Sequence, residues 1–151
     1  MDLPVSTEAV QEPVEVCIAQ ASDRYDVPDL LIKSILHVES RTGQAKGGRV
    51  GDKKPDGGGY ALGPMQINTL WLKELAKYEL NEADIKDSLC MNVMVGTWIL
   101  RGYYEHHNQD WTKAVMSYNA GFRLENGRPY AVKVITHWHS LFDKHETAKL
   151  Y

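Results

Sequence analysis

The segment from Leu89 to His107, LCMNVMVGTWILRGYYEHH, most limits what this chain can fold into. Its apolar residues are spread around nearly the whole circumference of the expected helix instead of along one stripe. Such a helix is stable only when other elements cover it on all sides, so we expect it at the centre of the fold. With 151 residues, 43% of them hydrophobic, the chain can build one such core. The sequence therefore predicts a single domain around a buried central helix.

Five further segments show the apolar spacing that is typical of helices. They span residues 14–26, 28–42, 67–80, 110–121 and 128–145. Pro28 suits a first helical turn, and Asp110 and Gly121 suit an N-cap and a C-terminal stop. Residues 43–59 are so rich in Gly, Lys and Asp that they predict a long loop or irregular hairpin, and residues 81–88 predict a polar connection. The fold class is thus mainly α, with six helices, a glycine-rich loop and at most a small β excursion.

Charge and hydropathy argue against two kinds of partner. The formal net charge of −3 and the pI near 6.1 describe a mildly acidic protein, whereas nucleic-acid binding usually requires a basic patch. No apolar run approaches the roughly 20 residues that span a bilayer, so no transmembrane segment is expected. Residues 1–14 are acidic, contain two prolines and lack a core pattern. They predict a flexible leader ahead of a domain at residues 15–151.

The cysteines and histidines do not form a recognisable metal motif. Cys17 and Cys90 are too far apart for a CxxC site, and they are either two buried thiols or one disulfide. His137 and His139 are two residues apart, which places them on different faces of a helix, and the remaining histidine pair is adjacent in sequence. We therefore expect no metal and no cofactor.

Glu39 is an unusual residue at the end of an apolar helical run, VPDLLIKSILHVES. On a helical wheel it falls within the apolar stripe, between Ile32 and Ile35. One interpretation is an acid that reaches solvent in the last turn. The other is a functional acid, because apolar neighbours and the negative end of the helix dipole both raise the pKa of a carboxyl. A carboxylic acid that stays protonated near neutral pH suits a general acid for glycosidic cleavage.

Three later stretches carry residue types that suit a sugar-binding cleft. GPMQIN places Met65 and Gln66 directly after the glycine-rich loop, SYNAG places Tyr118 and Asn119 at a helix end, and RPYAVKV places Tyr130 near the start of the last helix. Each stretch also has a purely structural interpretation. GPMQIN could be core followed by a helix start, SYNAG could be a helix C-cap, and Tyr130 could be a core tyrosine.

Taken in this order, ES, GPMQIN, AVMSYNAG and the tyrosine of RPYAVKV resemble the soluble lytic transglycosylase family, whose fold is similar to goose-type lysozyme. The resemblance covers about residues 17–142. Together with DSLCMNVMVGTWIL, it is closest to the small transglycosylases that accompany secretion and conjugation machines. It implies a lysozyme-like α+β domain with the glycine-rich loop, or a small β-hairpin, over the cleft.

The resemblance also implies roles for individual residues. Glu39 corresponds to the family's sole catalytic acid and base. Ser40, which follows it, lies on the polar arc of the wheel and is given a supporting role. The substrate-binding positions that the resemblance implies are Ser40, Met65, Gln66, Tyr118, Asn119 and Tyr130.

The implied reaction cleaves the β-1,4 bond between N-acetylmuramic acid and N-acetylglucosamine in peptidoglycan and forms a 1,6-anhydro product without water. Partners would be glycan strands and components of a secretion, pilus or conjugation apparatus. The implied location is the periplasm or another exported site, with the export signal removed from this chain. In that oxidising compartment, the resemblance favours a Cys17–Cys90 disulfide.

Two alternatives to this function remain. Asp56 in the glycine-rich loop is a candidate second carboxylate, which would make the protein a hydrolytic muramidase. The simpler interpretation of Asp56 is a solvated loop residue. A non-enzymatic alternative is a wall-binding scaffold that keeps the fold, although the presence of Glu39, Gln66 and Tyr130 argues against it.

Overall fold

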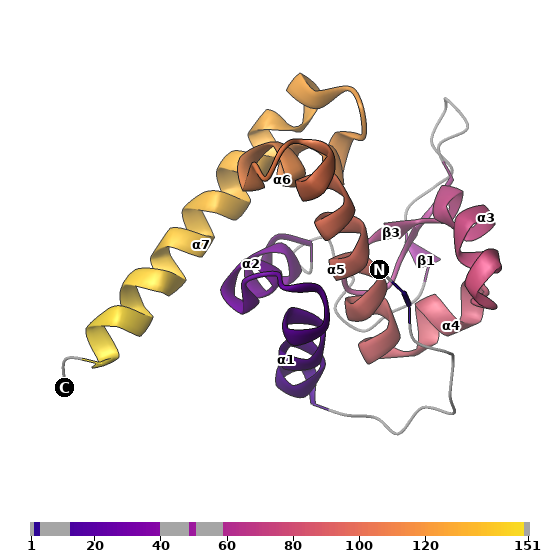
Figure 1. Cartoon of the computed structure of the whole chain (residues 1–151), viewed down its shortest axis with the longest axis horizontal. Coiled ribbons are helices and arrows are strands. Elements are labelled where there is room, and N and C mark those ends of the chain that lie inside the picture. Colours follow the sequence, from indigo (N-terminus) through magenta and orange to yellow (C-terminus); the bar gives the residue numbers. More distant parts are fainter. Residues whose placement is uncertain (1, 4–12, 40–48, 51–58, 150–151) are drawn as a thin grey trace.

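The computed structural model describes residues 2–3, 13–39, 49–50 and 59–149, and its architecture is mainly helical (Figure 1). The α-helices are α1 (Val14–Tyr25), α2 (Asp29–Glu39), α3 (Leu72–Leu75), α4 (Glu82–Asp87), α5 (Leu89–His106), α6 (Trp111–Ala120) and α7 (Arg128–Lys149). The short 3-10 helices are η2 (Thr69–Trp71), η3 (Ala76–Tyr78) and η4 (Leu124–Gly127). The strands are β1 (Arg49–Val50), β2 (Ala61–Leu62) and β3 (Ile67–Asn68).

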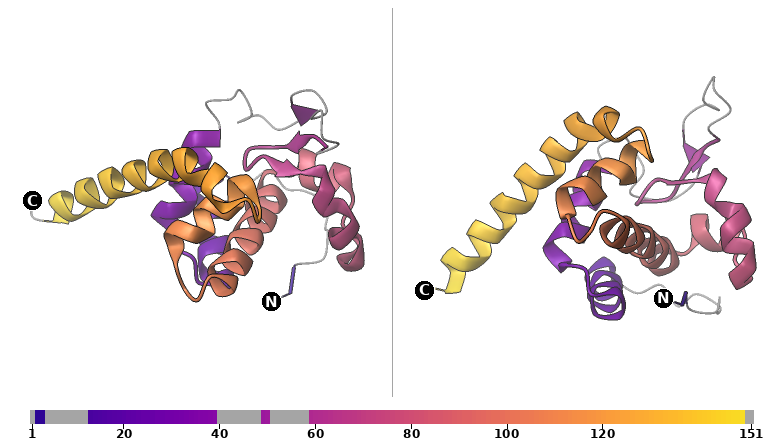
Figure 2. Two further views of the ribbon diagram at one scale, coloured as in Figure 1. Left: turned by 90° about the horizontal axis from the view of Figure 1, so that it is seen from above. Right: turned by 45° about the horizontal axis from the view of Figure 1, so that its top comes forward.

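Helix α5 is the centre of the fold, as its apolar composition predicts. It contacts α1, α4, α6 and β3, and the right-hand view of Figure 2 looks nearly along it with the other elements around it. Ser88 caps its N-terminus by accepting a hydrogen bond from the Met91 amide at 3.1 Å. Val93, Val95 and Leu100 on α5 are fully buried. The predicted central helix is therefore confirmed.

The predicted β excursion is a small antiparallel sheet in the order β1-β2-β3. Its strands are only two residues long, so few backbone groups pair within the sheet. The buried side chain of Asn92 supplies further hydrogen bonds to the backbone around it. The Asn92 amide on α5 donates to the carbonyls of Leu62 and Ile85, each at 2.9 Å, and its Oδ1 accepts from the Met65 amide at 2.7 Å. A side chain at Gly63 would overlap this amide, and the positive φ of Gly63 (64°) also favours glycine. The turn between β2 and β3 is thus fixed to the central helix.

Two segments differ from the sequence predictions. Helix α4 lies in the stretch expected to be a polar connection, which makes seven α-helices in the described part of the chain instead of six. A capping box stabilises it, because Asn81 and Asp84 each accept a hydrogen bond from the other's amide, at 2.8 and 3.0 Å. The single helix expected at 67–80 is instead β3 followed by η2, α3 and η3. Its start is a strand because Ile67 and Asn68 pair with β2.

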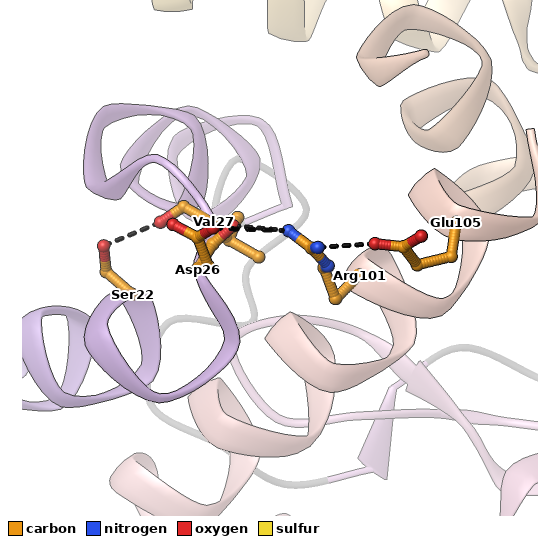
Figure 3. Close-up of polar contacts among 5 residues, drawn as sticks. All are labelled: Ser22, Asp26, Val27, Arg101 and Glu105. Atoms are coloured by element: carbon orange, nitrogen blue, oxygen red, sulfur yellow. Dashed lines mark hydrogen bonds and ion pairs between the residues drawn. The ribbon is translucent and has the colours of Figure 1, made fainter. Parts of the chain in front are cut away.

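Arg101 connects α5 to the junction between α1 and α2 (Figure 3). Its guanidinium donates to the Asp26 carbonyl at 2.8 Å and to the Glu105 carboxylate. Asp26 has a left-handed backbone, and the neighbouring Val27 carbonyl accepts from the Ser22 hydroxyl at 2.6 Å. These contacts set the direction in which α2 leaves the junction, and therefore the position of its last residue, Glu39.

The two cysteines form a disulfide, which resolves the choice left open by their spacing. Cys17 on α1 and Cys90 in the first turn of α5 are bonded, with their Cα atoms 4.8 Å apart. The bond closes a sequence separation of 73 residues and fixes the first helix to the central one.

The first residues of the chain are partly docked on the body. Leu3 is buried, and the Asp2 carbonyl accepts hydrogen bonds from the Arg24 guanidinium and from the Tyr25 hydroxyl at 2.8 Å. Residues 4–12 of the predicted leader lie outside the described part. Among the described helices, none combines the length and apolar character needed to cross a membrane.

Replacing Gly127 with alanine is expected to destabilise the fold by about 2–4 kcal/mol. An added Cβ would lie 2.1 Å from the Met116 carbonyl oxygen, and this backbone atom cannot move without displacing α6. Urea unfolding measures the effect. Gly102→Ala is the matched control, because a Cβ there has open space and alanine favours the helix, so stability should stay equal or rise. Equal stability of the two variants would contradict the close approach of η4 and α6.

Candidate active site

Glu39 is the last residue of α2, and the apolar face of that helix positions it. Ile32 and Ile35 are fully buried beside it, as the helical wheel predicts. Helix α2 packs against α7, and the rings of His37 and His137 stack between the two helices with centroids 3.8 Å apart. Figure 1 shows α2 beside α7. This packing brings the end of α2 toward the start of α7, where Tyr130 lies.

Burial raises the pKa of Glu39 from 4.5 to about 7. The low-polarity surroundings disfavour the ionised carboxylate, and a hydrogen-bonding interaction with Tyr130 opposes the shift by favouring it. The sequence predicted this direction from apolar neighbours, and burial is indeed the cause. Near neutral pH a large fraction of Glu39 is therefore protonated.

Tyr130 faces the carboxyl of Glu39 from the first turn of α7. Burial and the nearby Glu39 charge hold the pKa of its phenol well above the usual value, so the hydroxyl stays protonated. This hydroxyl is buried and has no hydrogen-bond partner of standard geometry within the described residues. Its interaction with the Glu39 carboxyl lowers the pKa of that carboxyl and raises the pKa of the phenol.

Tyr118 positions the turn that faces Glu39. Its hydroxyl, on α6, donates to the Met65 carbonyl at 2.6 Å, and burial raises the pKa of the phenol well above its usual value. The side chain of Met65 is fully buried against Gly96 of α5. The structure therefore places Met65 in the core instead of on the cleft wall where the resemblance put it, because the turn directs its side chain inward and only its backbone carbonyl meets Tyr118.

Gln66 follows Met65 and has a positive φ of 54°, which is uncommon for a residue with a side chain. Its backbone amide and its side-chain Nε2 both donate to the Gly63 carbonyl at 3.0 Å. These two bonds hold the side chain and leave its Oε1 as a hydrogen-bond acceptor at the pocket. Strained backbone of this kind is common at functional sites.

A pocket of about 220 Å³ opens at Glu39. It brings together four of the residues predicted from sequence, namely Glu39, Gln66, Tyr118 and Asn119. Its full lining is Glu39, Ala61, Gln66, Ile67, Asn68, Trp71, Ile99, Tyr118 and Asn119. Of the four other predicted positions, Met65 and Tyr130 do not line this pocket, and Ser40 and Asp56 lie outside the described residues.

Asn68 and Trp71 line the pocket but were not among the predicted site residues. Asn68 caps η2 by accepting from the Leu70 amide at 2.8 Å, which leaves its side-chain NH2 available to a ligand. Asn68 is the last residue of GPMQIN and Trp71 lies three positions further on, so the motif itself was a usable signal. They were missed because residues 67–80 were predicted as one helix.

The chemistry available in this pocket is acid–base chemistry by one carboxyl, surrounded by neutral amides and aromatic rings. Among the described residues that line it, Glu39 is the only acidic one. The part of the chain that the structure describes holds no group of three or more side chains that could bind a metal ion. A protonated acid beside amide groups matches the needs of a site that cleaves bonds between N-acetylated sugars.

Fold and pocket together are those of a lysozyme-like domain. The chain belongs to the family described as "Transglycosylase SLT domain", whose pattern it matches over residues 16–128. It is 32% identical to a "Peptidoglycan-binding-like protein" of Escherichia coli O157:H7 over 123 residues, which cover 78% of this chain and 73% of the relative. It is 30% identical to the "Invasion protein IagB" of Salmonella typhimurium LT2 over 128 residues, which cover 83% and 76%. This membership supports a role on peptidoglycan.

Proposed function

We propose that this protein is a peptidoglycan lytic transglycosylase that cleaves the β-1,4 bond between N-acetylmuramic acid and N-acetylglucosamine. The observation that carries the proposal is the Glu39 carboxyl, whose pKa of about 7 keeps it available both as an acid and as a base. A single group that changes roles between two steps suits an intramolecular reaction better than hydrolysis with a separate nucleophile.

In the first step, protonated Glu39 donates its proton to the glycosidic oxygen while the bond from that oxygen to the anomeric carbon breaks. The 2-acetamido oxygen of the muramic acid stabilises the positive charge at the anomeric carbon. In the second step, the Glu39 carboxylate removes the proton from the 6-hydroxyl of the same sugar as that oxygen bonds to the anomeric carbon. The proton from the 6-hydroxyl reprotonates Glu39, and the product is a 1,6-anhydro sugar.

The other pocket residues would bind and orient the strand. Gln66 Oε1 and the side-chain amide of Asn119 are suited to the N-acetyl and hydroxyl groups of the sugars. Tyr118 acts through the Met65 carbonyl, so it is a positioning residue for the turn that carries Gln66. Ser40 keeps its expected supporting role.

Replacing Tyr130 with phenylalanine should extend cleavage to higher pH. The general acid must be protonated, so the wild-type rate should fall as pH rises through about 7. Tyr130 lowers the pKa of Glu39, and its loss therefore raises that pKa further. The alkaline limb of the pH–rate profile should move to higher pH by about half a pH unit to one pH unit. A pKa change of this size corresponds to the free energy of one lost hydrogen bond.

Tyr118→Phe is the control for this shift. It removes a hydroxyl that is bonded to the Met65 carbonyl, so it should lower the rate while the limb stays near its wild-type position. A Tyr130→Phe limb at or below the wild-type pH would mean that Tyr130 does not stabilise the ionised form of Glu39.

Product analysis tests the reaction itself. Purified sacculi are digested in water enriched in heavy oxygen, and the muropeptides are examined by mass spectrometry. Anhydro-muropeptides without the label support the proposal. Labelled reducing ends would instead support the hydrolytic muramidase that uses Glu39 and Asp56. Binding to sacculi without any cleavage would support a wall-binding scaffold.

The cellular role that we propose is local opening of the wall for a secretion or conjugation apparatus, in the periplasm. The likeness to a protein named as an invasion protein supports a role with such an apparatus. The Cys17–Cys90 disulfide supports an oxidising compartment. Complementation of a deletion strain with the wild type and with Glu39→Gln tests it. Only the wild type should restore assembly of the apparatus.

A further inference from the structure

The pocket at Glu39 is one end of a longer groove. It shares Asn68, Trp71, Tyr118 and Asn119 with a neighbouring pocket of about 650 Å³. That pocket in turn shares Trp71, Tyr103 and Phe122 with a third one of about 470 Å³. Because consecutive pockets have walls in common, one ligand could lie along all three.

Aromatic rings follow this groove away from Glu39. Tyr103 of α5 meets Trp71 edge to face, with ring centroids 6.3 Å apart. Phe122 meets Tyr103 in the same way at 6.4 Å and also lies 5.4 Å from the His106 ring. Trp98 of α5 also meets Trp71 edge to face, with ring centroids 6.0 Å apart.

Phe122 is the unusual member of this series, because 79% of its surface is exposed. An apolar ring this exposed gains little from folding, and such residues often mark binding surfaces. Gly121 directs it there: the backbone of Gly121 has φ 59° and ψ −132°, a conformation that suits glycine, and its amide is bonded to the Ser117 carbonyl at 2.7 Å. The chain thus turns sharply at the end of α6 and presents Phe122 beside Tyr103.

The chemistry of the groove fits a sugar polymer better than a peptide. A pyranose ring has a flat face of C–H groups, which packs on aromatic rings, and a rim of hydroxyl and acetamido groups, which bond to amides. The groove supplies both, since the side-chain amides of Asn68, Asn119 and Asn126 line its middle part. Two arginines line the groove: Arg101 at the far end is paired with Asp26 and Glu105, whereas Arg123 in the middle part could meet an acidic peptide stem. The preference for sugar therefore rests on the aromatic rings and the amides.

We propose that Trp71, Tyr103 and Phe122 form an aromatic platform that binds sugar units of the glycan strand remote from the bond at Glu39. The platform rests on the proposed function, in that the same strand would enter the Glu39 pocket. It makes the protein select long glycan strands over short fragments.

The test measures binding of a six-sugar N-acetylglucosamine oligomer by calorimetry in the Glu39→Gln background, where nothing is cleaved. Phe122→Ala should weaken binding about five- to tenfold, as expected for one aromatic contact and its buried area, and Phe122→Trp should restore it. Phe142→Ala is the matched control, because Phe142 is also an exposed phenylalanine (52%) but lines none of the three pockets. It should bind like the parent.

Equal affinity of the Phe122→Ala and Phe142→Ala proteins would overturn the platform, and so would failure of the oligomer to bind. A loss seen only with strands that carry peptide stems, and not with the sugar oligomer, would also overturn it by assigning the groove to peptide. Because the measurement does not depend on cleavage, these results separate the platform from the reaction. Absence of anhydro products in the wild type would reject the proposed reaction and leave the platform standing.

Discussion

Replacing Glu39 with glutamine is expected to lower the rate of glycan cleavage by about 10³-fold. Glutamine has nearly the same shape, but it can neither donate the proton to the glycosidic oxygen nor accept one from the 6-hydroxyl. The single substitution therefore blocks both the protonation of the leaving oxygen and the deprotonation of the 6-hydroxyl. Release of soluble muropeptides from sacculi measures the loss. A variant that keeps more than a tenth of the wild-type rate would show that Glu39 is not the catalytic acid.

The same substitution should stabilise the folded protein at alkaline pH, which separates loss of activity from loss of fold. The folded-state pKa of Glu39 is raised from 4.5 to about 7, so the wild type loses stability as pH rises through this interval. Above pH 7 the cost of the buried charge approaches about 3 kcal/mol, which glutamine avoids. Thermal unfolding at pH 8 and pH 4.5 tests this expectation. The advantage of Glu39→Gln should appear at pH 8 and be small at pH 4.5.

Loss of the Cys17–Cys90 disulfide is expected to cost about 4 kcal/mol of unfolding free energy. The bond closes a sequence separation of 73 residues, and by the loop-entropy relation a loop of that length restricts the unfolded chain by about this amount. The folded state would also lose the covalent tie between α1 and α5. Urea unfolding of the wild type and of the Cys17→Ala/Cys90→Ala double variant measures the difference.

Added reductant provides the control for this experiment. It should lower the urea midpoint of the wild type to near that of the double variant and leave the double variant unchanged. An unchanged wild-type midpoint would show that the disulfide does not form in the isolated protein or does not stabilise it. Because α1 leads directly into α2, the reduced protein should also cleave glycan less efficiently near its unfolding temperature.

Local patterns in the sequence were sufficient to predict the parts of the fold that depend on one helix at a time. The all-round apolar composition of α5 placed it at the centre, and the position of Glu39 within the apolar stripe of α2 predicted the direction of its pKa shift. Helix α4 was missed although its capping residues, Asn81 and Asp84, were visible in the sequence.

Features that depend on contacts between distant segments could not be predicted in this way. Met65 is buried because Gly96, 31 positions later, leaves room for it on α5. The pairing of β2 and β3 replaced the start of a predicted helix, and the chain that follows places Trp71 on the pocket wall. The resemblance named Met65 as part of a motif, but only the fold distinguishes its backbone contact to Tyr118 from a contact to substrate.

The three hydrogen bonds of the Asn92 side chain have a consequence for how such a domain can diversify. They attach both the end of β2 and the Met65 turn to the rigid central helix, so the wall that carries Gln66 does not depend on a long sheet for its position. Substitutions elsewhere in the small sheet can therefore accumulate while the Met65 turn and Gln66 keep their places.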